Sequence, residues 1–512
     1  MKTTLVTGIA AGCVVASGAL WPVAAADTEP APSDRSAAPA PADSYIVTTK
    51  PSVGLDDVIA DAAPSADVTA VTGPAFRGGV ADLTDAQAAA LAETPGVVAV
   101  EPEQLFTAAA ETRNQRTRAQ RTRAASVAAT WALDRIDQRE LPLNGRFAPT
   151  GTGKGVHVYV VDSGITPKHP EFAGRIGKGT FTNGGSLKDC YGHGTHVAGT
   201  IASNTYGIAP DAIVHPVRVL DCAGGGSTSS ILAGLNWVAR NAPRDAIVNL
   251  SLRGSYSAAL NSAVRDLVRS GRIVVTASGN DGTDACKYSP GSESAALNIG
   301  ATDTRDREAS FSNFGECVDM YAPGVAIRST DFAGGTSRLE SGTSMAAPHV
   351  SAVAAVLWQS NPKLSGEQIQ AKLLQQATRG AVAFPLGQSE SPNLLLFAEP
   401  ARSPGTPGRV TAAAGDAKAK VKWRRASSNT ATTSYTVTAA PGGLRCRTTN
   451  DTTCTVKGLA NGVSYTFTVR ANNIAGRSQL SSESPAVQPT DVTAARQRAA
   501  KGPRATRKGR TP

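Results

Sequence analysis

Three short blocks of the sequence hold an acid, an imidazole and a hydroxyl in settings where each could do chemistry. Asp162 ends the apolar run VVD, His193 lies in the glycine-flanked run GHGTHVAG, and Ser344 lies in GTSMAAPH. A serine hydroxyl is a poor nucleophile until a histidine takes its proton, and the histidine needs a carboxylate to fix its tautomer. Asn280, in the run ASGN, could donate a hydrogen bond to the oxyanion that forms when a carbonyl is attacked. These residue types together predict attack of a serine on a carbonyl group.

The same residues lie beside segments that have the pattern of buried strands or helix starts. Near-continuous apolar runs at 156–161, 246–250 and 272–276 are typical of strands buried on both faces. Helical patterns at 230–240 and 259–269 lie between these runs. The alternation predicts an α/β fold with a parallel sheet and crossover helices. Functional groups of such a sheet gather at the carboxyl ends of its strands, so the side chains can converge there.

The blocks, their order Asp–His–Ser and the asparagine together resemble the subtilisin-like serine peptidases (subtilases), nearest to the proteinase K branch. The resemblance covers about residues 131–397 and implies a subtilisin-like, doubly wound parallel sheet. It implies that Asp162 orients the histidine, that His193 is general base and acid, and that Ser344 is the nucleophile. Asn280 is implied as the oxyanion donor. The other five histidines are expected to be packing or surface residues.

Two glycine-bearing segments resemble the edges with which this family pairs an extended peptide by strand addition. The substrate-binding residues implied in this way are Gly224, Gly226, Ser251, Leu252 and Gly254. Arg253 and Thr228 depart from the proteinase K pattern, which has glycine and a larger aromatic residue at these places. The subsite preference is therefore open, and Arg253 could favour acidic side chains in the substrate.

Six cysteines remain once Cys13 is removed with the N-terminal signal described below. An even count in an exported chain indicates disulfides, and the absence of any CxxC disfavours zinc. Six cysteines allow 15 pairings, and the residues alone do not choose among them. The resemblance to aqualysin-like subtilases implies the pairs Cys190–Cys222 and Cys286–Cys317, and Cys446 would pair locally with Cys454.

Family members often bind calcium through a carboxylate and main-chain carbonyls. Asp319 matches such a carboxylate position, with Ser294 and Ala296 as carbonyl donors, and an exposed loop aspartate is the alternative. A structural calcium ion and no catalytic cofactor are expected.

The N-terminus predicts an exported precursor. Residues 1–26 have a lysine, an apolar stretch and small residues at a cleavage point, which is typical of a secretory signal. Cys13 offers a lipoprotein signal as the less favoured alternative. Residues 44–108 have the strand and helix signals of a small α+β unit, with Thr84 as the expected N-cap of a helix at 83–93. This unit resembles the inhibitor I9-type propeptide of subtilases.

The C-terminal part changes character. Alternating, Thr- and Val-rich strands between 410 and 489 predict a β-sandwich, and this stretch resembles a fibronectin type III module with Trp423 in its core and Tyr465 in a tyrosine corner. The predicted segments are a signal peptide at 1–26, a disordered spacer at 27–43, the propeptide at 44–108, an Arg-rich processing linker at 109–130, the peptidase domain at 131–398, a linker at 399–408, the fibronectin-like domain at 409–490 and a basic tail at 491–512.

The formal charge of +10 is unevenly distributed. Residues 111–123 carry +4 and residues 492–512 carry +7, which leaves −1 for everything else. The folded body is therefore expected to be near neutral, without a basic face for nucleic acid. Beyond the N-terminus the sequence has no apolar run of about 18 residues, so no membrane span is predicted there.

The sequence thus predicts a secreted, extracellular serine endopeptidase that hydrolyses proteins through an acyl-enzyme and is processed from a zymogen. The expected partners are protein or peptide substrates and the chain's own propeptide, with weak polymer or cell-surface binding by the C-terminal module. Nucleic acid and membrane are not expected partners, and a monomer is expected. The alternative is a non-catalytic surface-binding protein on a subtilase scaffold, which predicts a missing member of the Asp–His–Ser set, and none is missing.

Overall fold

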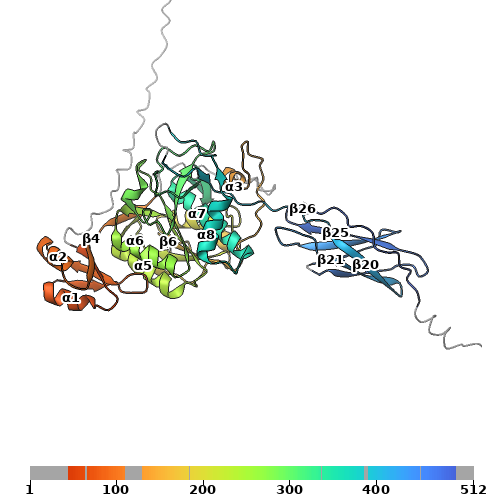
Figure 1. Cartoon of the computed structure of the whole chain (residues 1–512), viewed down its shortest axis with the longest axis horizontal. Coiled ribbons are helices and arrows are strands. Elements are labelled where there is room, and N and C mark those ends of the chain that lie inside the picture. The colour runs from red at the N-terminus through yellow and green to blue at the C-terminus, as the bar shows by residue number, and fades with distance from the viewer. Residues whose placement is uncertain are drawn as a thin grey trace, which may run out of the picture. The chain divides into compact units, whose positions relative to one another are not determined.

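A computed structural model describes residues 44–63, 66–109, 130–183, 185–335, 337–385, 390–449 and 451–491 (Figure 1). The predicted signal peptide and spacer, and almost all of the Arg-rich linker and the basic tail, lie outside the described residues. The domain boundaries given above remain predictions.

The N-terminal unit is an antiparallel sheet packed against two helices. The strands follow the order β2-β3-β1-β4, and residues such as Val47, Leu55 and Leu91 form the core between sheet and helices. Helix α2 begins after Thr84, whose side chain forms a capping box with Gln87, so the predicted N-cap is confirmed. The elements are β1 (Ser44–Thr49), α1 (Leu55–Ala62), β2 (Val68–Ala70), β3 (Gly78–Asp82), α2 (Asp85–Ala92) and β4 (Val97–Pro102), followed by β5 (Leu105–Ala108).

The central domain contains a nine-stranded sheet in the order β18-β19-β15-β14-β12-β10-β6-β8-β7. All neighbouring strands are parallel except β18 and β19. Its strands are β6 (His157–Asp162), β7 (Thr180–Phe181), β8 (Ile213–Arg218), β10 (Ile247–Leu250), β12 (Ile273–Ala277), β14 (Leu297–Thr302), β15 (Met320–Pro323), β18 (Thr378–Arg379) and β19 (Leu394–Leu395). The helices are α3 (Trp131–Ile136), α4 (His193–Ala202), α5 (Thr228–Asn241), α6 (Ala258–Arg269), α7 (Thr343–Ser360) and α8 (Gly366–Gln376), with short 3-10 turns at Pro170–Phe172 and Ala285–Lys287. Smaller strands are β9 (Gly225–Ser227), β11 (Leu252–Ser255), β13 (Tyr288–Ser289), β16 (Ile327–Thr330) and β17 (Ser337–Glu340).

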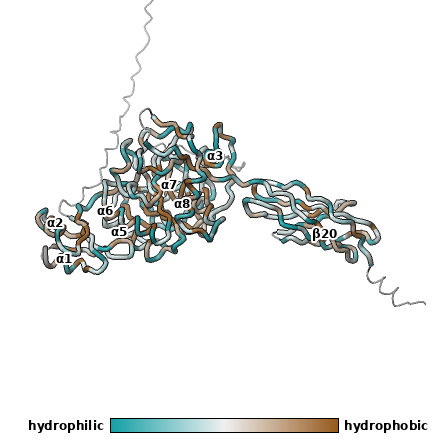
Figure 2. Tube along the Cα trace, in the orientation of Figure 1, coloured by the Kyte–Doolittle hydropathy of each residue, from teal (hydrophilic) through white to brown (hydrophobic). Residues whose placement is uncertain are grey.

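Helices cover both faces of this sheet. Val158 and Val160 of β6 belong to a core shared with α4 and α7, whereas Tyr159 and Val161 belong to a core shared with α5 and α6. Successive side chains of a strand point to opposite faces, so a strand buried on both must be apolar throughout. Figure 2 shows hydrophobic segments gathered in the interior around α7. The predicted doubly wound α/β fold is confirmed.

The order of the strands places a switch point beside β6. The chain continues from β6 to β8 on one side and later to β10 on the other. Crevices in open α/β sheets form at the carboxyl ends of strands where the order reverses in this way. Asp162 is the last residue of β6 and therefore lies at that point.

The C-terminal module has two antiparallel sheets, as predicted. One sheet contains β20 (Gly408–Gly415), β21 (Lys418–Arg424) and β24 (Thr453–Lys457), and the other contains β22 (Ser434–Ala440), β23 (Arg445–Thr448), β25 (Thr466–Asn473) and β26 (Gly476–Arg477). Trp423 is buried in the core, 5.2 Å from the Tyr435 ring. The hydroxyl of Tyr465 accepts a hydrogen bond from the backbone N–H of Ala460 at 3.1 Å, which is the geometry of a tyrosine corner.

Three disulfides are formed: two are the pairs that the resemblance implied, and the third is the expected local pair in the C-terminal module. They join Cys190 to Cys222, Cys286 to Cys317, and Cys446 to Cys454. The first joins the segment that leads to α4 to the loop after β8, and the second joins the 3-10 turn at Ala285–Lys287 to the segment just before β15.

Candidate active site

The Asp162 carboxylate and the His193 imidazole are in contact and buried. His193 is the first residue of α4, and its Nδ1 lies 2.8 Å and 2.9 Å from the two carboxylate oxygens of Asp162. The carboxylate fixes the tautomer with hydrogen on Nδ1 and leaves Nε2 as the proton acceptor. Among the described residues, Nε2 of His193 is buried without a hydrogen-bond partner.

The close approach of α4 to the strand end requires a glycine after His193. A Cβ atom on Gly194 would lie 2.2 Å from the carbonyl oxygen of Gly164 and 3.2 Å from Cβ of Asp162. Both neighbours are close to the Asp162–His193 contact, so a larger residue would force the helix away from the strand. Packing thus explains the second glycine of the run GHG.

Asp189 holds the turn that leads into α4, a function that was not predicted from the sequence. Its carboxylate accepts hydrogen bonds from the N–H of Gly192 at 2.6 Å, from Ser163 Oγ at 3.0 Å, and from the N–H and hydroxyl of Thr195 at 2.9 Å and 2.7 Å. Burial raises the pKa of Asp189, while these donors act in the opposite direction. The signal in the sequence was an acid just before the His193 block.

Ser344 lies in the first turn of α7 and is fully buried. Its hydroxyl donates to the carbonyl oxygen of Ser251 at 2.9 Å, and its backbone N–H donates to the carbonyl oxygen of Ala109 at 3.1 Å. No hydrogen bond joins Ser344 to His193 in this arrangement, so attack requires a rotation of the hydroxyl toward Nε2.

The side-chain amide of Asn280 is oriented by Thr343. The N–H and the hydroxyl of Thr343 both donate to Oδ1 of Asn280 at 2.9 Å. The other amide atom, Nδ2, is buried and has no partner among the described residues. A buried unpaired donor destabilises a fold by about 1–3 kcal/mol, which is tolerated where the donor serves a ligand or a reaction.

The chain's own segment 105–109 occupies the cleft between the two predicted substrate edges. Strand β5 pairs antiparallel with β9, where Phe106 is opposite Gly226, and with β11, where Ala108 is opposite Leu252. The N–H of Ala108 donates to the Gly224 carbonyl at 3.2 Å, and that of Ala109 donates to the Ser251 carbonyl at 3.3 Å. All the predicted edges therefore contact an extended peptide, and the sequence had not placed Ala109 at Ser344.

The glycines of these edges serve different purposes. A Cβ on Gly254 would lie 2.6 Å from the Phe106 ring, so this glycine makes room for a side chain of the bound segment. Gly224 has a φ of +84°, and Gly226 packs against the carbonyl of Val219. Of these three glycines, Gly254 alone makes room for the paired segment because it has no side chain.

Arg253 is already paired within the protein. Its Nη2 lies 2.8 Å from Oδ1 of Asp281, next to Asn280, and its guanidinium lies 5.6 Å from the centre of the Tyr288 ring. The ion pair with Asp281 offsets the positive charge of Arg253, and the expected preference for acidic substrates depends on that charge. That preference remains a prediction.

The predicted calcium residues lie near one another. The Asp319 carboxylate accepts a hydrogen bond from the N–H of Asn298 at 2.7 Å. Asn298 is two residues after Ala296, and Ser294 lies in the turn just before them. Burial raises the pKa of Asp319 to about 6, and no cationic side chain of the described residues forms an ion pair with it. No group of three or more His, Cys, Asp or Glu side chains that could hold a metal occurs in the described parts. The donors present therefore fit only a site with one carboxylate and main-chain carbonyls.

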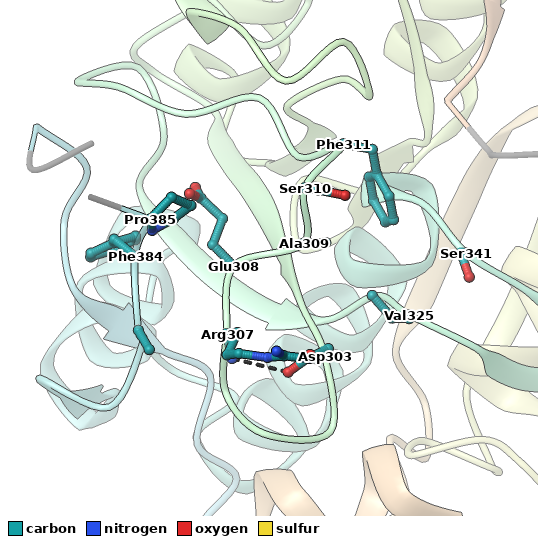
Figure 3. A pocket seen from close by; sticks show the side chains of 11 residues that line it. Asp303, Arg307, Glu308, Ala309, Ser310, Phe311, Val325, Ser341, Phe384 and Pro385 are labelled. Carbon is teal, nitrogen blue, oxygen red and sulfur yellow. Dashed lines mark hydrogen bonds and ion pairs between the residues drawn. The ribbon is translucent and has the colours of Figure 1, made fainter. Parts of the chain in front are cut away.

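A separate cavity of about 580 Å³ is lined by residues such as Asp303, Arg307, Phe311 and Ser341 (Figure 3). The Arg307–Asp303 ion pair of 2.6 Å forms part of its wall. None of the predicted catalytic residues lines this cavity. The cleft beside the predicted catalytic residues is filled by segment 105–109.

Comparisons with known proteins agree with this geometry. The subtilase family matches residues 153–394, and the fibronectin type III domain matches residues 405–487. An "Extracellular serine proteinase" of Thermus sp. (strain Rt41A) is 48% identical over 326 residues, which are 63% of this chain and 76% of the relative. "Proteinase R" of Parengyodontium album is 39% identical over 338 residues, 64% of this chain and 83% of the relative.

A solved structure is similar as well. The crystal structure of a cold adapted subtilisin-like serine proteinase superimposes with a TM-score of 0.51 at 42% identity, covering 53% of this chain and 98% of that one. Within the residues that the structure describes, no helix is long and apolar enough to cross a membrane.

Proposed function

The chain belongs to the subtilase family and is a serine-type endopeptidase, and we propose that Asp162, His193 and Ser344 are its catalytic residues, with Asn280 as oxyanion donor. The observation that carries this proposal is the Ala109 carbonyl, whose oxygen lies 3.1 Å from the Ser344 N–H. A carbonyl held by the amide of the nucleophile is positioned as the reacting carbonyl of a substrate. We also propose that the enzyme is secreted, because the relative from Thermus sp. is named as an extracellular proteinase and residues 1–26 have the pattern of a secretory signal.

In the proposed reaction, Ser344 Oγ attacks the substrate carbonyl carbon and passes its proton to Nε2 of His193. Asp162 stabilises the imidazolium through Nδ1–H, and the oxyanion accepts hydrogen bonds from the Ser344 N–H and from Nδ2 of Asn280. His193 then gives the proton to the leaving amine as the C–N bond breaks. A water molecule, deprotonated by His193, hydrolyses the acyl-enzyme and restores the Ser344 hydroxyl.

The N-terminal unit is proposed to be an inhibitory propeptide. Two of its carboxylates reach helix N-termini of the peptidase domain: Glu101 accepts from the Ala258 N–H at 3.0 Å and from the Ser257 hydroxyl. Glu103 accepts from the Ser229 N–H at 3.1 Å and from the hydroxyl of that serine. A carboxylate at a helix N-terminus satisfies free N–H groups and interacts favourably with the helix dipole. These contacts hold the unit where segment 105–109 fills the cleft.

Self-processing should cut the bond on the carboxyl side of Ala109, because that carbonyl lies at Ser344. We expect N-terminal sequencing and intact mass of the first secreted form to give Ala110 as the first residue. The five arginines of 111–123 would then remain on the enzyme until a second cut removes them.

A first N-terminus inside or after the arginine run, without an Ala110 form at early times, would contradict this assignment. The variant Ala109→Asp should delay the cut, because an unpaired carboxylate is costly at a position that is only 1% exposed. Thr130→Asp, at the far end of the linker, is the control and should leave the rate of the cut unchanged.

We propose that Asp319, with the carbonyls of Ser294 and Ala296, would hold a structural calcium ion. The ion would balance the buried carboxylate and stabilise the turn before β14. EDTA should then lower the melting temperature of the wild-type protein and leave that of Asp319→Asn unchanged. An equal shift in both proteins would place the sensitive site elsewhere.

A further inference from the structure

The C-terminal module is strongly basic, and this corrects the expectation of a near-neutral folded body. Residues 409–490 contain eleven Lys and Arg but three Asp and Glu, a net charge of +8. The charge of −1 outside the two basic runs, 111–123 and 492–512, is therefore the sum of +8 on this module and −9 on the rest of the chain. Averaging the charge over several domains concealed a basic face.

Four arginines gather on the outer face of the sheet formed by β22, β23, β25 and β26. Thr436 is opposite Arg447 on β23 and opposite Arg470 on β25, and Thr438 is opposite Arg445. Asn472, two residues from Arg470 on the same face, is opposite Arg477. We call Arg445, Arg447, Arg470 and Arg477 the Arg face; they line a shallow groove of about 370 Å³.

The positive charge of the Arg face is not balanced within the described protein. None of the four guanidinium groups forms an ion pair there. Nε of Arg470 is shielded from solvent and has no hydrogen-bond partner among the described residues, while Arg447 donates to the Ser434 hydroxyl at 3.0 Å. Arg447 and Arg470 flank Thr436 on the same face of the sheet, and their like charges repel. An anion in the groove would remove this repulsion and give Arg470 an acceptor.

We propose that the Arg face binds an acidic polysaccharide through carboxylate or sulfate groups. Guanidinium groups bind such planar or multidentate anions through paired N–H donors. Alternate residues of a strand lie about 7 Å apart and next-but-one strands about 10 Å apart, so the cations suit a linear polymer with repeated charges.

The composition of the groove favours a polysaccharide over a nucleic acid. Its walls consist of arginine, threonine, asparagine and a leucine, without an aromatic side chain on which a base could stack. Threonine and asparagine offer donors and acceptors for sugar hydroxyls. The opposite sheet also carries a basic row, Lys418, Lys420, Lys422 and Arg424 on β21, but these are exposed along a single strand and do not line the groove.

The test compares two variants of the secreted enzyme with equal loss of charge, each expressed from the full chain and freed of its N-terminal unit. Both are inactivated with a fluorophosphonate before binding is measured. The first carries Arg→Gln at all four positions of the Arg face, and the control carries Gln at the four basic positions of β21. Binding to fluorescein-labelled heparin is measured by anisotropy at several salt concentrations, with duplex DNA as the second probe. Activity on a small peptide, measured before the inactivation, and the melting curve check that both variants are folded.

We expect the Arg-face variant to bind heparin about tenfold or more weakly than wild type, since several charge-assisted contacts of modest strength are lost together. The affinity of the β21 control for heparin should fall about threefold or less. A variant with Lys at the four Arg-face positions should have an intermediate affinity, because lysine keeps the charge but lacks the paired N–H donors of the guanidinium group. Equal losses in the first two would show dependence on net charge alone. Undiminished binding by both would assign it to the tail, and duplex DNA bound as tightly as heparin would exclude the proposed ligand class.

Discussion

Ser344→Ala should abolish both substrate turnover and removal of the N-terminal unit. Without the hydroxyl no acyl-enzyme can form, so only the background from the oxyanion donors and binding remains. The expected fall in kcat is on the order of a millionfold, a magnitude taken over from subtilisin, a member of this family, and not obtained from the distances above. The measurements are hydrolysis of a chromogenic peptide, labelling by a fluorophosphonate, and the intact mass of the secreted chain.

The design must separate lost chemistry from retained inhibition, because an unprocessed Ser344→Ala chain keeps segment 105–109 in its cleft. A trace of mature wild-type enzyme should therefore be used to cut the variant precursor, and the purified product should still be inactive and unlabelled. Ser351→Ala is the matched control, since Ser351 lies on the same helix, fully buried, and donates instead to Asn249 at 2.8 Å. A Ser344→Ala precursor that removes its own N-terminal unit would contradict the proposed nucleophile.

The sequence predicted the elements of the site because local physics determines them. The apolar run before Asp162 is typical of a strand buried on both faces, and the glycines around His193 mark a place of tight packing at a helix start. The predicted strand at 272–276 appears as β12, shifted by one residue, with Asn280 just beyond its end. Local pattern and strand order were sufficient to bring these residues to one edge of the sheet.

The parts that the sequence could not give depend on contacts between distant segments. Ala109 is an ordinary alanine, and only the pairing of β5 with β9 and β11 places its carbonyl at Ser344. Likewise, Asp189 is significant through the set of donors that the fold gathers around it, and Arg253 through its pairing with Asp281. None of these relations has a signature within a few residues of sequence.

Asn280→Ala should lower kcat by about a hundredfold to a thousandfold and leave KM little changed. Nδ2 would donate to the oxyanion, whose charge develops in the transition state, so its loss raises the barrier by about 3 kcal/mol without weakening substrate binding. This magnitude too is the one known for the corresponding donor in subtilisin. Initial rates over a range of peptide concentrations separate kcat from KM.

The substitution also removes Oδ1, which accepts two hydrogen bonds from Thr343, so a second variant is needed to isolate the donor. Asn280→Asp keeps an oxygen for Thr343 and replaces Nδ2 with an anionic oxygen; its kcat should fall at least as far as that of Asn280→Ala. Thr343→Val keeps Nδ2 but removes one anchor of the amide, so its loss should be smaller, about tenfold or less. If Asn280→Asp retained wild-type kcat, the unpaired amide would have no part in the reaction, and the Ser344 N–H would be left as the one donor assigned to the oxyanion.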